Sequence, residues 1–547
     1  MNKWIKNVAL TSLLLGTSAS LLSGCMAGKK STNGNGATET VAIPDGIWDP
    51  YEKEVVLTTV NAESGGLEFQ NGEDWDNNAW NKAIKDRFNI TIKNEWLSND
   101  YTTKLNLSIA DGDLPDVFRV NEQQLKQLHD ADLIMDLTEL FDKYASDNLK
   151  SYKEKVPDTF QTGYFDGKLY GVPQLTYGVI DQFNYVWIRK DWKDELGLAD
   201  PKTMGDVIAI TQAFQKKYGG YGMAEQQSLD SMYRLAPAWG VNPKIWVETE
   251  NGNLEYGSIQ PKMKEVLKAY RDWYKAGVLN PNFTTQNQDK MFQELINGNT
   301  GVVTFAQWLG YFPGPDIIRN LGPDALFEPY AIPSATGEPV RGNMTFANSG
   351  YVVVNKNTKN PEAVFKLINF WAYMLDDAAG KETPEFINSL FSYNYPDLAF
   401  YKVINPDTDY DQYVQLSTAL ADYQAGKEVD LEALGKNVSK YNNFIKWMDE
   451  KDPTAVGDWL QQGNSKSAYG IAKGLLDNEQ YVKDKLWGAQ PPTLVQSGST
   501  LDDILNEGFT KIITGEKEVD YFDEVVKQWK KAGGDVATEE VNAQYGK

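Results

Sequence analysis

The chain has 547 residues, a net charge of −23 and a single cysteine. This length exceeds what one hydrophobic core can organise, so two or three domains are expected. Such an acidic chain repels nucleic acid, and no nucleic-acid partner is expected. With one cysteine and one histidine, neither a disulfide framework nor a zinc site is expected.

The first 24 residues have the layout of an export signal. Lys3 and Lys6 are basic, residues 8–22 are mostly apolar, and Ser23 and Gly24 are small. The apolar run is shorter than the roughly 20 residues that span a bilayer. We therefore predict a cleaved signal peptide over residues 1–24. A short hydrophobic helix that stays in place is the alternative.

The cysteine follows this segment directly. Leu22-Ser23-Gly24-Cys25 resembles the lipobox of bacterial lipoproteins. The resemblance implies cleavage before Cys25 and attachment of a lipid, such as palmitate, to its sulfur. The mature chain then has no cysteine left to form a disulfide. The segment 25–47 is rich in Gly, Ser, Asn and Thr and has no apolar period, which predicts a flexible tether.

Strands and helices alternate over the next part of the chain. Residues 54–61 are a β-branched run that predicts a buried strand. Helices are expected in "DWDNNAWNKAIKDRFNI" and "YTTKLNLSIADGD", and strands in "ITIKNEWL" and "LPDVFRVN". This order is typical of a parallel sheet flanked by helices. The Asp-Gly pair in "FDGKLYGVP" predicts a hairpin.

A second α/β pattern follows, and then a helical tail. "YVWIRKDWKDELGL" predicts a strand that passes into a helix, and residues 204–218 predict an amphipathic helix. Strands are expected in "GVVTF", "FEPYAIP" and "SGYVVVNKN". "PEAVFKLINFWAYM" predicts a strong helix with Pro361 in its first turn. From Thr383 onwards the chain is expected to be mostly helical.

Several of these segments together resemble one family, the extracellular solute-binding proteins (family 1) of ABC importers, in the large carbohydrate-uptake lipoprotein subgroup. The resemblance runs from about Glu54 to the end, in the family's order. It is carried by "GDLPDVFRVN", "FDGKLYGVPQ", "YVWIRKDWKDELGL", "ELINGNTGVVTFAQW", "NSGYVVVNKNTKNPEAVFKLINF" and the C-terminal "ILNEGFTKIITGEKEVDYFDEVVKQWKKAGGDVATEEVNAQY".

The resemblance implies an α/β fold of two lobes, of the periplasmic-binding-protein type II (maltose-binding-protein-like) kind, with a mostly helical C-terminal extension. Residues 48–175 and 328–378 would form lobe 1, and residues 180–325 and 385–547 would form lobe 2. The chain would cross between the lobes near residues 172–185, 325–330 and 371–377.

The resemblance also implies a function. Ligand would lie between the lobes, which close on it, and the closed form would meet the membrane permease of an ABC importer. We expect a monomeric, non-enzymatic receptor for an oligosaccharide, lipid-anchored on the outer face of the cytoplasmic membrane of a Gram-positive cell. Aromatic residues make up 12% of the chain, which favours a sugar.

Two other functions stay open at this point. A peptide-binding lipoprotein would share the architecture but pair its ligand in strand fashion. A surface glycoside hydrolase would need two opposed carboxylates across a cleft, and no local motif isolates such a pair. A Ser-His-Asp hydrolase would depend on His129, which lacks a Gly-x-Ser-x-Gly context.

No metal and no cofactor is expected. Many relatives carry a calcium loop of Asp-x-Asn-Gly type after the helix that follows "RKDW". Here that place reads "FQKKYGGYGMAE", which lacks the spaced carboxylates that calcium needs.

A sugar site needs an aromatic plate together with planar polar groups, and ligands of α/β sheets lie beyond the carboxyl ends of the strands. Trp308 follows the strand "GVVTF" and sits where the family places a sugar-stacking aromatic, with Gln307 beside it. Trp75 stands among polar residues at a helix start and is a second plate candidate. Packing in the core, or at the helix start, is the alternative for each tryptophan.

The other candidates are polar residues near strand ends and lobe crossings. Asn121 follows the strand "DVFRV" and is equally suited to cap the next helix. Tyr177 lies in the crossing segment, where hinge packing is the alternative. Asp230 and Arg234 share a helix face and either grip ligand or form a surface ion pair. Asn348 precedes "SGYVVV" and completes the predicted site.

Overall fold

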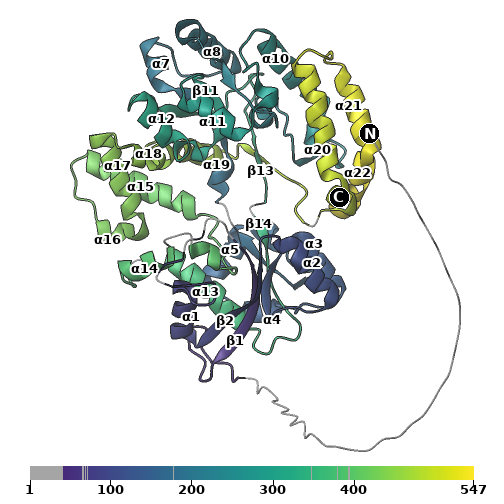
Figure 1. The fold of residues 1–547 in the computed structure, drawn as a ribbon, viewed down its shortest axis with the longest axis vertical. Coiled ribbons are helices and arrows are strands. Elements are labelled where there is room, and N and C mark those ends of the chain that lie inside the picture. The colour runs from purple at the N-terminus through teal and green to yellow at the C-terminus, as the bar shows by residue number, and fades with distance from the viewer. Residues whose placement is uncertain are drawn as a thin grey trace, which may run out of the picture. The chain divides into compact units, whose positions relative to one another are not determined.

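The computed structural model describes residues 41–63, 67, 69–70, 72–175, 178–346, 348–378, 380–391, 395–488 and 490–546. The predicted signal peptide, Cys25 and residues 25–40 of the predicted tether lie outside the described residues. Figure 1 shows the arrangement of the helices and strands.

The first lobe begins with the predicted β-α-β unit. Strand β1 (Val55–Ala62) pairs in parallel with β2 (Ile90–Ser98), and helix α1 (Ala79–Phe88) connects them. The Asn78 side chain caps the start of α1 by accepting the N–H of Asn81. Asn89 ends this helix in the left-handed conformation, with φ 58°. The parallel pairing predicted for this part of the chain is thus confirmed for β1 and β2.

The third strand joins strands from distant parts of the sequence. Strand β3 (Val117–Val120) pairs antiparallel with β14 (Asn348–Val354), which also pairs antiparallel with β6 (Val172–Leu175). Side chains tie this sheet to the first one, since the N–H of Thr58 donates to Oδ2 of Asp116 at 2.9 Å. The predicted hairpin is present as β4 (Tyr164–Phe165) and β5 (Lys168–Leu169), with Gly167 at φ 77° in its turn.

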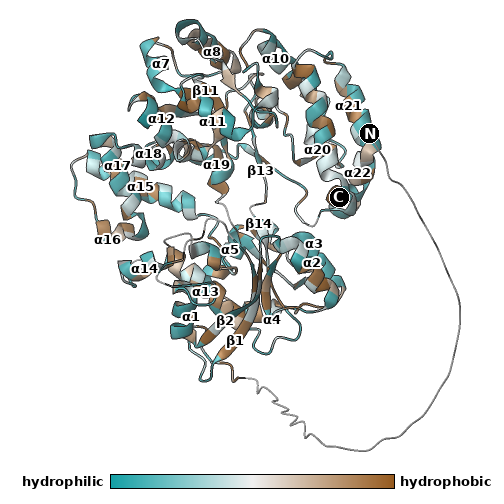
Figure 2. Ribbon diagram, viewed as in Figure 1, coloured by the Kyte–Doolittle hydropathy of each residue, from teal (hydrophilic) through white to brown (hydrophobic). Residues whose placement is uncertain are grey.

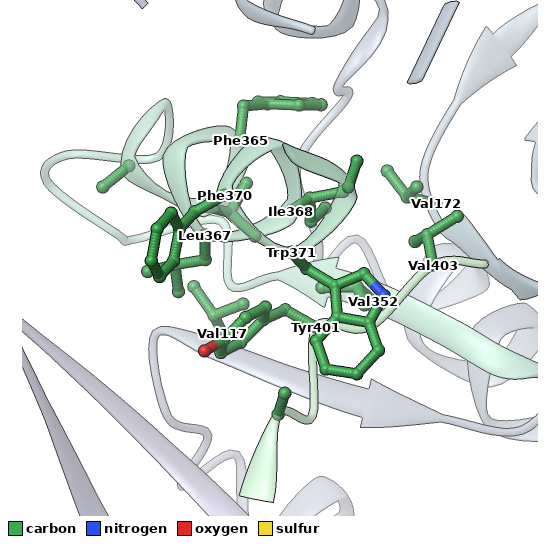
Figure 3. Close-up of a cluster of buried hydrophobic side chains, with 14 of the residues drawn as sticks. Val117, Val172, Val352, Phe365, Leu367, Ile368, Phe370, Trp371, Tyr401 and Val403 are labelled. Carbon is green, nitrogen blue, oxygen red and sulfur yellow. The ribbon is translucent and has the colours of Figure 1, made fainter. Parts of the chain in front are cut away.

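Helix α13 (Ala363–Asp376) forms the centre of the first lobe's core. Eleven of its 14 residues are buried, as expected for a helix that is apolar nearly all round. In Figure 3, Phe365, Phe370 and Trp371 project from different sides of it, close to the strand residues Val172 and Val352. The helix predicted from "PEAVFKLINFWAYM" is therefore confirmed, although it begins after Pro361.

One lysine of α13 ties the entry segment of the chain to this core. The ammonium of Lys366 donates to the carbonyl oxygens of Gly46, Ile47 and Asp49 at 3.1, 3.0 and 2.8 Å. Burial lowers the pKa of Lys366. Hydrogen bonds from a charged donor are stronger than neutral ones, so residues 46–49 are held firmly against α13.

The second lobe is built on a four-stranded mixed sheet. Its strand order is β12 (Phe327–Ala331), β7 (Asn184–Arg189), β11 (Val302–Ala306) and β8 (Met223–Ala224). Strand β7 pairs antiparallel with both β11 and β12, whereas β8 is parallel to β11. The strands predicted over these segments are confirmed.

The pairing differs from the expected division of the lobes in two places. Residues 327–331 belong to the second sheet, although lobe 1 was expected to resume at 328. Residues 398–403 pack in the core around α13, although lobe 2 was expected from 385. Hydrogen-bond partners and core contacts, which no local pattern specifies, decide both points. The domain boundaries as a whole remain a prediction.

Helices cover both sheets. Those of the first lobe are α2 (Tyr101–Asp111), α3 (Glu122–Asp130), α4 (Thr138–Tyr144), α5 (Asp147–Lys155), α6 (Pro157–Gln161) and α14 (Pro384–Phe391). Those of the second are α7 (Lys190–Glu195), α8 (Met204–Tyr218), α9 (Asp230–Leu235), α10 (Met263–Lys275), α11 (Gln288–Ile296) and α12 (Gly314–Leu321), with a small ribbon of β9 (Trp246–Glu248) and β10 (Leu254–Tyr256).

The C-terminal extension is mostly helical, as predicted. Its elements are α15 (Thr408–Gln424), α16 (Leu431–Leu434), α17 (Val438–Glu450), α18 (Val456–Gln462), α19 (Ala468–Asp477), β15 (Tyr481–Lys483), α20 (Pro492–Ile513), α21 (Tyr521–Trp529) and α22 (Asp535–Tyr545). Phe509, Trp529 and Val541, one from each of α20, α21 and α22, are buried in the second lobe's core, so these three helices belong to that lobe. Strand β15 pairs in parallel with β13 (Gly342–Met344).

Hydropathy follows this layering. Figure 2 shows hydrophobic colour along β1, β2 and β14, whereas many helices carry hydrophilic colour on part of their surface. Among the described helices, none has the length and apolarity that a bilayer crossing requires.

Candidate binding site

A cavity of about 780 Å³ lies beside α9, the start of β7 and the segment that follows β12. Its volume is in the range of small-molecule sites. The lining includes four amides (Gln182, Asn184, Asn343, Gln480), two aromatic rings (Phe183, Tyr233) and five charged side chains (Lys202, Asp230, Arg234, Lys244, Glu338). Amides, rings and a few charges are the groups that bind hydroxyl-rich ligands.

A buried glutamate fixes the start of α9, the helix that supplies two of these charges. The carboxylate of Glu225 accepts the backbone N–H groups of Gln226, Ser231 and Met232 at 2.9, 3.1 and 2.9 Å. Burial raises its pKa to about 7, although these hydrogen bonds act in the opposite direction. Sequence reasoning missed Glu225; an acidic residue shortly before a helix is the only signal that could have indicated it.

Asp230 and Arg234 both line this cavity, but no ion pair joins them in the part of the chain that the structure describes. Oδ2 of Asp230 instead accepts Nε2–H of Gln226 at 2.6 Å. The guanidinium of Arg234 lies 4.6 Å from the ring centroid of Phe305. Its Nη1 is buried without a hydrogen-bond partner. A close ion pair between the two side chains is therefore absent from the described residues, although the Asp230 carboxylate opposes the lowering of the pKa of Arg234 by burial.

Asn121 and Asn348 come together at a second cavity, of about 430 Å³. Asn121 also caps α3, because its Oδ1 accepts the N–H of Gln124 at 2.8 Å. The capping role predicted as the alternative is thus confirmed, and it leaves the Asn121 side chain exposed at the cavity. Nδ2 of Asn348 is buried without a partner. Gln490 and Val495 of the C-terminal extension complete the lining.

Two carboxyl groups near this second cavity have raised pKa values. Burial raises the pKa of Glu122 to about 7, with Asp484 adding to the rise and a hydrogen bond from Tyr351 opposing it. Burial likewise raises the pKa of Asp484 to about 6. The two residues are far apart in sequence and no motif links them, so sequence reasoning missed both.

Gln307 and Trp308 follow β11 as predicted, but they do not line the two cavities above. Gln307 lies in a polar network, donating to Asp181 at 2.9 Å and accepting from Gln461 at 2.8 Å. Trp308 is half-buried and meets the ring of Phe305 edge-on, with centroids 4.6 Å apart. It therefore supports the ring on which Arg234 rests.

Asp181 connects two segments at the edge of the second lobe. It lies in the short 3-10 helix Val179–Gln182 after β6, and it hydrogen-bonds to Asp409 at the start of α15 and to Tyr469 of α19. Burial and the neighbouring Asp409 carboxylate raise the pKa of Asp181 to about 8.

The remaining predicted site residues lie elsewhere. Trp75 is half-buried, packs against the first lobe's core and meets Phe69 edge-on at 6.0 Å. This agrees with its alternative as a packing residue at the start of α1. Tyr177 lies outside the described residues. Gln174, three residues earlier, is buried and donates to the carbonyl oxygens of Phe400 and Lys402 at 2.5 and 3.1 Å, which ties β6 to a segment of the first lobe's core.

Metal-ligating side chains do not gather in the part of the chain that the structure describes. No group of three or more His, Cys, Asp or Glu suited to a metal ion occurs there. The absence of calcium at residues 214–225 stays a prediction, to be checked by measuring the metal content of the purified protein. The single histidine, His129, stacks on Phe165 with ring centroids 4.2 Å apart.

Several known proteins are similar to this chain in sequence or in fold. Lipoprotein LipO of Bacillus subtilis is 20% identical, with 97% of each chain covered. The fructooligosaccharide ABC transporter substrate-binding protein FusA of Streptococcus pneumoniae is 24% identical over 50% of this chain and 53% of FusA.

A solved structure, the "HMO binding ABC-transporter associated Solute Binding Protein" of Bifidobacterium longum infantis, has a TM-score of 0.59. It covers 90% of this chain and 100% of that chain at 15% identity, which shows a shared two-lobe α/β fold. The family model described as "Bacterial extracellular solute-binding protein" matches residues 75–373. Since this match spans more than half of the sequence, the chain belongs to the family of bacterial extracellular solute-binding proteins.

Proposed function

We propose that this chain is the substrate-binding lipoprotein of an ABC importer and that it captures an oligosaccharide for delivery to the membrane permease. The observation that carries the proposal is the cavity of about 780 Å³, whose amides and aromatic rings suit the hydroxyls and the apolar faces of sugar rings. FusA, similar in sequence, is named for fructooligosaccharide, and LipO is named a lipoprotein.

The proposal extends to localisation and partners. Lipid on Cys25 anchors the protein to the outer face of the cytoplasmic membrane of a Gram-positive cell, where it acts as a monomer beside the permease subunits. Residues 1–24 serve as the signal peptide. The ligand-binding set comprises Trp75, Asn121, Tyr177, Asp230, Arg234, Gln307, Trp308 and Asn348, of which Asp230 and Arg234 have the most direct structural support.

We also propose that the chain binds its ligand without transforming it. Its family and the relatives above are described as binding proteins. A glycoside hydrolase would instead release a shortened sugar. A peptide-binding lipoprotein would give a heat of binding with peptides and none with sugars.

Isothermal titration calorimetry of the full chain in detergent tests the proposal. The panel contains gluco-, galacto-, fructo- and uronate oligosaccharides together with tri- to pentapeptides, and each mixture is then analysed by chromatography for cleavage. We expect saturable heat with at least one oligosaccharide and an unchanged ligand afterwards. Heat from peptides alone would overturn the substrate class, and cleaved sugar would overturn the non-enzymatic function.

A further inference from the structure

The cavity beside α9 differs from the rest of the chain in its charge. Acidic side chains outnumber basic ones in the whole sequence, 76 to 53. The cavity lining reverses this order, with the basic Lys202, Arg234 and Lys244 against the acidic Asp230 and Glu338. In a site surrounded by an acidic chain, this reversal favours a ligand with negative charge.

Arg234 is the central element of this lining. The guanidinium is mostly removed from water, and its Nη1 is buried without a hydrogen-bond partner. A buried cation without a counter-charge is unfavourable. Phe305 supports one face of the guanidinium at 4.6 Å, which leaves the edge with its N–H groups for a partner.

The acidic residues close to Arg234 are already engaged. Asp230 accepts the amide of Gln226 at 2.6 Å. Glu225 accepts three backbone N–H groups at the start of α9. Of the other two basic residues, Lys244 is paired with Asp502 at 2.9 Å. Asp230 and Glu225 oppose the lowering of the pKa of Arg234 by burial, but no carboxylate lies within ion-pair distance of the guanidinium in the described residues, and its Nη1 has no hydrogen-bond partner.

We infer that this site takes an acidic oligosaccharide, in which a carboxylate on a sugar ring pairs with the guanidinium of Arg234. The inference rests on the proposed function and names its substrate class. A guanidinium presents its N–H donors in a planar fork that matches the two oxygens of a carboxylate, whereas a neutral hydroxyl supplies no counter-charge. The amides and rings of the lining then bind the remaining hydroxyls and ring faces.

The decisive experiment compares each acidic sugar with its own methyl ester, which keeps the ring and the linkage but removes the charge. Calorimetry of the full chain uses trimers of galacturonate, mannuronate and guluronate and of a glucuronate-containing sugar, their methyl esters, and neutral gluco- and fructo-trimers. We expect at least one acid to bind tenfold or more tightly than its ester. Raising the salt concentration is expected to narrow this difference.

Variants locate the effect. In Arg234→Gln, the affinity for the preferred acid falls at least tenfold, while that for its ester changes less than twofold. Arg234→Lys keeps the charge without the fork and gives an intermediate affinity. Arg319→Gln, which removes an exposed arginine paired with Asp316 on α12, changes neither affinity. Circular dichroism checks that each variant is folded, and the acid–ester comparison on the unmodified chain decides the question if Arg234→Gln does not fold.

The outcomes separate the two proposals. If no acidic sugar binds more tightly than its methyl ester or the neutral sugars, the inference of an acidic ligand is wrong. The proposal that the chain binds an oligosaccharide is then kept. If Arg234→Gln weakens acid and ester alike, the carboxylate does not meet Arg234. If no sugar of either kind binds, both proposals fail together.

Discussion

At the scale of single residues, the rings of Phe305 and Trp308 show how the cavity residue Arg234 is supported. Phe305 carries the guanidinium on its face at 4.6 Å and receives the edge of Trp308 at the same centroid separation. Trp308 is thus connected through Phe305 to the lining residue Arg234, although neither ring lines the cavity itself.

We expect Trp308→Ala to weaken oligosaccharide binding by more than about 1 kcal/mol, because Phe305 and then Arg234 lose their support. Calorimetry with the tightest ligand of the panel measures the change. Trp273→Ala is the control, since Trp273 is also half-buried but packs against Tyr270 and Trp239 instead. An unchanged affinity in Trp308→Ala would remove Trp308 from the site.

Sequence reasoning predicted which residues stand near a site better than it predicted what each one contacts. The spacing of Asp230 and Arg234 placed both on one face of α9, and both line the same cavity. The sequence did not predict that Asp230 accepts a hydrogen bond from Gln226 or that Arg234 lies over the ring of Phe305, because both contacts depend on the tertiary fold. Glu225 could not be recognised, because one acidic residue before a short helix is common in an acidic chain.

At the scale of elements, local patterns predicted the helices and strands well. Helix α8 spans residues 204–218 as predicted, and the Asp-Gly pair gives the β4–β5 hairpin. Pairing across the sequence was harder to foresee. The hydrophobic pattern of β12 predicts a strand but does not indicate which sheet the strand joins. Its hydrogen bonds to β7 place it in the second lobe.

The contact between the 3-10 helix at Val179–Gln182 and helix α15 is expected to depend on pH. The pKa of Asp181 is about 8 in the folded chain, above the roughly 3.9 of an unfolded aspartate. The fold therefore favours the protonated carboxyl, and this stabilisation is lost as the pH rises toward 8. Burial also raises the pKa values of three other carboxyl groups, so their contribution to stability likewise decreases as the pH rises; they are Glu122, Glu225 and Asp484.

Asp181→Asn tests this contribution, because the amide keeps the acceptor for Gln307 and Tyr469 and cannot ionise. The free energy of unfolding is expected to fall between pH 5 and pH 8 in both proteins. We expect the fall in the variant to be smaller than that in the unmodified chain, and the two falls to differ by about 1 kcal/mol or more. Urea unfolding followed by circular dichroism measures it. The exposed Asp111→Asn is the control, and an equal fall in both variants would contradict the role of Asp181.

At the scale of the whole molecule, the resemblance of ordered segments predicted the family and the two-lobe fold. The precise residues at which one lobe gives way to the other were not accessible, because they depend on which core a segment joins. Residues 398–403 show this, since they follow a helical region yet pack around α13.

Attachment to the membrane is predicted from the sequence alone, because Cys25 lies outside the residues that the structure describes. We expect Cys25→Ser to abolish fatty-acid labelling and to move the protein from the membrane pellet to the soluble fraction, because the variant lacks the sulfur on which the proposed lipid would be attached. Ser31→Ala is the control and keeps both properties. Sugar affinity should be equal in both variants, and labelling of Cys25→Ser would contradict the assignment of the anchor.

The three hydrogen bonds of Lys366 determine where mechanical load from such an anchor would enter the folded chain. Tension along the N-terminal segment would first reach Val41, whose carbonyl oxygen accepts a hydrogen bond from Asn360 at 3.0 Å. It would then reach residues 46–49, which Lys366 links to α13 in the core of the first lobe. The second lobe lies off that load path. An anchor attached through this segment would therefore hold the chain by its first lobe.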